Sequence, residues 1–64
     1  MVIDLRFILV YDGGRAREYS KQNFISLDRA RDYALAIGRM HQAKAVYARS
    51  NDWKRVIFRV IIDE

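Results

Sequence analysis

The chain contains no cysteine, no proline and a single histidine, His41. Without cysteine there is neither a disulfide framework nor a thiolate metal site, and one histidine is too few for a structural zinc site. The lack of cysteine fits the reducing cytoplasm. We therefore expect a cytoplasmic protein that holds no metal and no cofactor.

Long apolar runs are also missing. No run approaches the ~20 residues that a membrane-spanning helix needs, and the start, Met1-Val2-Ile3-Asp4, lacks the basic region and apolar stretch of a secretory signal. We therefore expect no membrane partner.

The composition is that of a small folded protein with a basic excess. Its 64 residues are 52% apolar and 31% charged, and the 12 basic against 8 acidic residues give a net charge of +4. This length predicts one domain over residues 1–64, in which folding buries only about 60% of the unfolded surface. A modest positive charge suits nucleic acid or an acidic protein surface, or serves solubility alone.

Alternating apolar side chains predict a strand near each end of the chain, over residues 2–11 and 53–62. In the last strand one face is wholly apolar, and the other alternates arginine with large apolar groups. The apolar face carries Val56, Phe58, Val60 and Ile62, and the mixed face carries Trp53, Arg55, Ile57, Arg59 and Ile61. The mixed face is the most informative feature of the sequence.

Asp12-Gly13-Gly14 is typical of a hairpin turn, because glycine adopts the positive φ that tight turns require. A three-residue loop places Ile8 opposite Glu18, whereas a two-residue loop would place Glu18 on the core face. We prefer the three-residue loop, followed by a short polar edge strand over residues 15–21.

A helix is predicted over residues 27–41. Ser26 is a favourable N-cap, and the 3.6-residue period gathers the apolar residues on one face. That face contains Leu27, Ala30, Tyr33, Ala34, Ile37, Met40 and His41. Leu35 falls among charged residues and is expected to be exposed.

The third strand is expected over residues 43–49, with Asn51-Asp52 as a two-residue turn. That turn places Ala43, Ala45 and Tyr47 on the core face, and Lys44, Val46 and Ala48 outside. A three-residue loop would reverse both sets and bury Lys44, which is costly for an unpaired charge. A slip of one residue would flip the whole strand.

These elements predict an α+β fold with the order ββαββ: a four-stranded, mostly antiparallel sheet under one helix. The two long apolar strands belong in the centre, which predicts the strand order 2-1-4-3. One helix covers one face, so the opposite face stays open. We call the residues expected there the predicted patch: Arg6, Ile8, Val10, Lys44, Val46, Trp53, Arg55, Ile57, Arg59 and Ile61.

The predicted patch is too apolar for a solvated face, and such patches usually mark a binding site. The leading interpretation is binding to a protein partner, including a homodimer made by stacking two such faces. The alternative is single-stranded DNA or RNA, with Trp53 stacking on a base and Arg6, Arg55, Arg59 and Lys44 meeting phosphate.

A second basic feature is the hairpin containing Arg15 and Arg17, which lacks the spacing of a phosphate-binding loop and is more simply a charged turn. Few residues of the sequence indicate catalysis. His41 is the only side chain that ordinarily titrates near neutral pH, and it falls on the apolar side of the helix. We therefore predict a non-enzymatic protein without catalytic residues.

Overall fold

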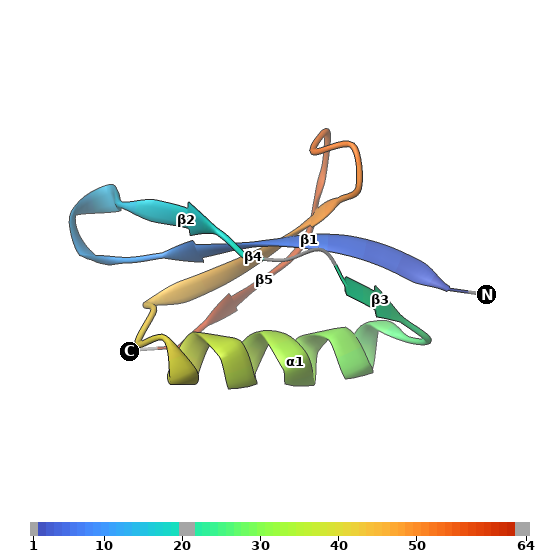
Figure 1. Ribbon diagram of the computed structural model, residues 1–64, viewed down its shortest axis with the longest axis horizontal. Helices are drawn as coiled ribbons and strands as arrows, with labels where there is room; N and C mark the ends of the chain where they lie inside the picture. The colour runs from blue at the N-terminus through green and yellow to red at the C-terminus, as the bar shows by residue number, and fades with distance from the viewer. Residues whose placement is uncertain (1, 20–21, 63–64) are drawn as a thin grey trace.

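One helix packs across one face of a five-stranded antiparallel sheet in the computed structural model, which describes residues 2–19 and 22–62 (Figure 1). The α+β class, the two layers and the single covering helix are confirmed. The elements in chain order are β1 (Ile3–Val10), a 3-10 turn (Asp12–Gly14), β2 (Ala16–Glu18), β3 (Gln22–Phe24), α1 (Leu27–Met40), β4 (Ala45–Ser50) and β5 (Val56–Ile61).

The first hairpin follows the predicted three-residue loop. Gly13 and Gly14 both have positive φ, 75° and 78°, and the N–H of Tyr11 donates to the carbonyl of Arg15 over 2.7 Å. Ile8 then pairs with Glu18, as expected. The returning segment forms two short strands, β2 and β3, which both pair with β1; Ser20 and Lys21 lie outside the described residues.

The helix begins where its cap predicts and ends one residue earlier than expected. The Ser26 hydroxyl accepts from the N–H of Arg29 over 3.3 Å, which satisfies one of the unpaired donors of the first turn. Ala30, Ala34, Ile37 and Gly38 are buried against the sheet. Leu35 was expected to be exposed, but it is half-buried and packs against the core.

The expected strand order is wrong in its second half. The observed order is β2-β1-β4-β5, and β3 pairs with β1 on the same side as β2. The strand expected over residues 43–49 is therefore central, and the strand expected over residues 53–62 lies at an edge. Small side chains explain the position of β4. Val46 and Ala48 have no exposed surface, and Val46 lies directly against Gly38 of the helix, where an added Cβ would be 2.9 Å from Val46 Cγ2.

The expected register of residues 43–49 is also wrong. The turn is a four-residue loop, 51–54, in which Trp53 has a φ of 69° and Ser50 pairs with Arg55. Val46 and Ala48 therefore face the helix, and Tyr47 faces away. The cost expected for burying the Lys44 charge does not arise, because Lys44 precedes β4 and much of its side chain is exposed. Its Nζ lies 3.2 Å from Asp12 Oδ1.

A β-bulge interrupts the pairing of β5 with β4 near the start of β5. Phe58 pairs with Ala48 and Val56 pairs with Arg49, which leaves Ile57 as the extra residue between them. The predicted apolar face of this strand is therefore correct for the buried Phe58 and Val60. It is wrong for Val56, which is 46% exposed.

Candidate binding surface on the open sheet face

The strand pairings define the sheet face that lies opposite α1. In β1, Leu5, Phe7 and Leu9 are buried towards the helix, so the residues between them point to the other side. Cross-strand partners share a face, which extends this assignment to β4 and β5. We call the following eight residues the open face: Arg6, Ile8, Val10, Ala45, Tyr47, Arg49, Arg59 and Ile61.

The centre of the open face is an apolar band with an aromatic ring in it. Tyr47 lies between its cross-strand partners, Ile8 on β1 and Arg59 on β5. Ile8 and Tyr47 are half-buried although none of the described helices and strands covers them, and Ile61 is 49% exposed. This band has the character of a contact surface, because solvated faces of antiparallel sheets are usually polar.

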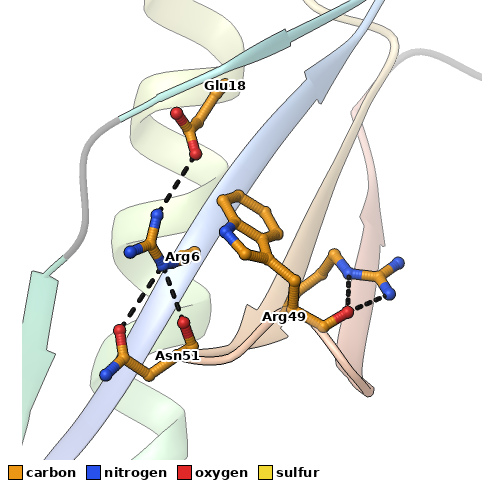
Figure 2. A network of polar contacts seen from close by, with 5 residues as sticks. Arg6, Glu18, Arg49 and Asn51 are labelled. Carbon is orange, nitrogen blue, oxygen red and sulfur yellow. Dashed lines mark hydrogen bonds and ion pairs between the residues drawn. The ribbon is translucent and has the colours of Figure 1, made fainter.

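At one end of the open face Arg6 joins three parts of the chain (Figure 2). Its Nε donates to the backbone carbonyl of Asn51 over 2.8 Å, and its Nη1 lies 3.3 Å from Glu18 Oε2. Its guanidinium carbon also lies 4.8 Å from the centroid of the Trp53 ring. A guanidinium over an indole ring is a favourable cation–π arrangement. These contacts fix loop 51–54 beside the open face.

Arg49 holds the same loop by its backbone. Its Nε and Nη2 donate to the Trp53 carbonyl over 3.2 and 2.6 Å (Figure 2). Trp53 has a positive φ, which is unusual for a bulky residue, and this double donation to its carbonyl stabilises the conformation.

Asp52 completes the loop. Its Oδ1 accepts from Ser50 Oγ over 2.6 Å and from the Lys54 N–H over 2.9 Å. The hydrogen bond from Ser50, and then the one from Lys54, hold the pKa of the Asp52 carboxyl below its usual value.

The structure retains part of the predicted patch and replaces the rest. Arg6, Ile8, Val10, Arg59 and Ile61 lie on the open face, and Trp53 lies beside it in the loop instead of in the strand. Val46 belongs to the core and Lys44 lies just before the start of β4, so neither joins the face.

The two remaining members of the predicted patch adjoin the loop. Arg55 is exposed just before β5, and its N–H donates to Ser50 Oγ, while Ile57 occupies the bulge. Tyr47 and Arg49 were missed because the strand register was inverted. The alternative three-residue turn, rejected for its effect on Lys44, would have found them.

The open face carries more positive than negative charge. Arg6, Arg49 and Arg59 project from it. The acidic side chains on the same side of the sheet are Glu18, the cross-strand partner of Ile8, which lies 3.3 Å from Arg6, and Asp4, two residues before Arg6 in β1. Stacking two copies face to face would bring six guanidinium groups into one interface, which opposes self-association in that geometry.

The basic hairpin contributes to a separate hollow at the other end of the sheet. A cavity of about 590 Å³ lies among the hairpin, the end of α1 and the start of β4. It is lined by Tyr11, Asp12, Arg15, Arg39, His41, Gln42, Ala43, Lys44 and Ile62. Arg17 lies outside this lining, with its Nη2 3.4 Å from His41 Nδ1.

His41 adjoins this cavity but is poorly placed for proton transfer into it. Its ring packs edge-on against Tyr19, with the centroids 5.1 Å apart. Nδ1 lies 3.4 Å from Nη2 of Arg17, whose guanidinium has only donors. Nε2 is buried and has no partner among the described residues. A solute in the cavity therefore meets neither ring nitrogen freely, because Nε2 is buried and Nδ1 faces Arg17.

Within residues 2–19 and 22–62, no helix combines the length and apolar character required to cross a bilayer, and no three acidic or histidine side chains gather as metal ligands would. Comparison with protein-family models, with curated proteins and with solved structures finds no match to the chain.

Proposed function

We propose that this protein is a non-enzymatic interaction module that binds an acidic protein partner through the open face. The observation that carries the proposal is the uncovered band of Ile8, Tyr47 and Ile61 among three arginines. Apolar contact supplies most of the binding energy in such an interface, and the arginines favour a negatively charged partner and speed its association.

Arg59 and Tyr47 are the best positions for testing this proposal. Arg59 is exposed and Tyr47 is half-buried, and neither belongs to the helix-side core. The matched control is Arg29 on the exposed surface of α1. Arg59→Glu and Arg29→Glu change the net charge equally, so only the position of the charge distinguishes them.

The experiment places a photo-activated cross-linking amino acid at position 47, and at position 29 as the control, in the cells that make the protein. A protein captured from position 47 alone is then purified and titrated against the ¹⁵N-labelled chain. We expect shifts confined to β1, β4 and β5, and binding at least tenfold weaker for Arg59→Glu but unchanged for Arg29→Glu. Shifts confined to the helix would refute the proposal.

Single-stranded nucleic acid is the second candidate, and the position of Tyr47 favours it. An aromatic ring in the middle of a sheet, with arginine as its cross-strand partner, is an arrangement that suits stacking on a base beside a phosphate. In titrations with a 12-nucleotide single strand, this candidate predicts affinity that falls steeply between 50 and 200 mM salt. It also predicts loss of binding in Tyr47→Ser.

A further inference from the structure

The free edge of β5 has its backbone groups directed outwards. The Ile62 N–H donates to the Lys44 carbonyl over 2.8 Å, and the Ser50 N–H donates to the Arg55 carbonyl, so the even-numbered residues of segment 44–50 direct backbone groups towards the last strand. Hydrogen-bonded pairs alternate along a ladder, so Val60 bonds to Val46, whereas Arg59 and Ile61 direct their N–H and C=O groups away from β4. No other described strand lies beyond β5.

This edge has few of the features that protect an edge from pairing. It lacks proline and lysine, its bulge lies near one end, and Arg59 is its single charge between Val56 and Ile61. An exposed, mostly apolar edge of this kind is a template for another strand.

The pattern of the strand favours a second copy as that partner. Pairing about a two-fold axis requires outward-directed residues to meet outward-directed residues, which allows an axis at any residue of the strand. Axes at Phe58, Arg59 and Val60 are the ones that pair at least five of residues 56–62. An axis at Arg59 places two like charges opposite each other, and one at Phe58 involves the bulge. An axis at Val60 places Val60 opposite Val60, Arg59 opposite Ile61 and Phe58 opposite Ile62.

The helix supplies an independent observation on the same side of the molecule. The guanidinium carbon of Arg31 lies 5.1 Å from the Phe58 ring centroid, and Gly38 contacts Ile62. The helix α1 therefore runs alongside β5. Leu35 is four residues after Arg31 and three before Gly38, which places it on the same flank, level with Val60. It is an apolar side chain among charged ones at the position of the axis.

We propose that two copies of the chain pair antiparallel along β5, with the two-fold axis at Val60 and the two Leu35 side chains above it. The two sheets then form one continuous sheet with both helices on the same side. The open faces also join, and they remain free for the partner described above. This dimer differs from face stacking because it leaves Arg6 and Arg49 outside the interface and places each Arg59 opposite Ile61 instead of opposite another arginine.

The absence of cysteine makes the axis directly testable. In the proposed register, residue 60 of one copy and residue 60 of the other form a non-hydrogen-bonded pair, whose Cα separation is suitable for a disulfide. Under mild oxidation Val60→Cys is therefore expected to give covalent dimers. Arg59→Cys and Ala36→Cys, the latter exposed on the helix, are expected to give few. Efficient cross-linking of Arg59→Cys with none at position 60 would overturn the register.

A second measurement uses the unaltered protein and a proline variant. We expect dimers by sedimentation at 200 µM, with amide exchange of Arg59 and Ile61 slowing as concentration rises. Ile61→Pro removes an outward N–H and no bond to β4, so it is expected to give a folded monomer. A wild-type monomer with unprotected amides at this concentration would overturn the proposal.

Dimerisation and partner binding have separate readouts. Tyr47→Ser is expected to leave the sedimentation of the protein unchanged. If Tyr47→Ser abolished the dimer while Ile61→Pro did not, the dimer would form by face stacking and the β5 proposal would be refuted. The binding of a partner by the open face would be judged separately, by its own titration.

Discussion

The guanidinium carbon of Arg6 lies 4.8 Å from the centroid of the Trp53 ring, so the middle of the sheet is joined to loop 51–54. The same guanidinium bonds to Asn51 and Glu18, so one side chain connects β1, β2 and the loop. This relationship places the only tryptophan of the chain beside the open face, where its fluorescence is expected to report the conformation of the loop.

Arg6→Gln is expected to release the Trp53 ring and to lower the free energy of unfolding by about 1 kcal/mol, since an exposed cation–π contact and a surface ion pair are each worth a fraction of that. The measurement is tryptophan emission together with urea unfolding. Arg29→Gln on the helix is the control and is expected to change neither. An unchanged emission spectrum in Arg6→Gln would contradict the contact.

Val46→Ala tests the observed register of β4. Val46 has no exposed surface, so the substitution is expected to cost about 2 kcal/mol of unfolding free energy by thermal or urea denaturation. Val10→Ala, on the half-buried open face, is expected to cost less than about 1 kcal/mol. Equal losses at the two positions would argue against the register.

Gly38→Ala tests the close approach of α1 to the sheet. An added Cβ would lie 2.7 Å from Ile62 Cγ1 and Cδ1 and 2.9 Å from Val46 Cγ2. We expect a net loss of about 1–3 kcal/mol despite the better helix propensity of alanine. The variant Gly38→Ala/Ile62→Ala is expected to lose less than the sum of its two single changes, because Ile62 makes two of these contacts. Strict additivity would exclude this clash.

Asp52 predicts acid sensitivity of the loop. Its pKa is held below the usual value of 3.8 by hydrogen bonds from Ser50 and Lys54, so the charged form is the one that the fold favours. That contribution is complete above the usual pKa and is lost as pH falls through the lowered one. Carbon-detected NMR titration from pH 6 to 2 is expected to give a low midpoint for Asp52, accompanied by a shift in Trp53. Asp52→Asn, which has no carboxyl to titrate, is expected to remove the Trp53 shift at that midpoint.

Parts of the candidate site were predictable because they depend on local chemistry. Gly13-Gly14 supplied the positive φ of the first turn, and with it the correct pairing of Ile8 with Glu18. Arg6, Ile8 and Val10 were therefore assigned to the correct face. The prediction of the second turn was wrong, because the conformation of that turn depends on a positive φ at Trp53, and no local preference predicts a positive φ at a bulky residue.

The sequence by itself determined the α+β class, the first hairpin, the helix and its Ser26 cap, since alternation, turn residues and capping act over a few neighbours. Only the tertiary structure decided the neighbours of β4 and the side that Val46 and Tyr47 face. A shift of one residue leaves the local pattern of Ala45–Ser50 almost unchanged, and the choice depends on how closely small residues of the helix and strand approach. That contact between distant segments leaves Tyr47 among the arginines of the open face.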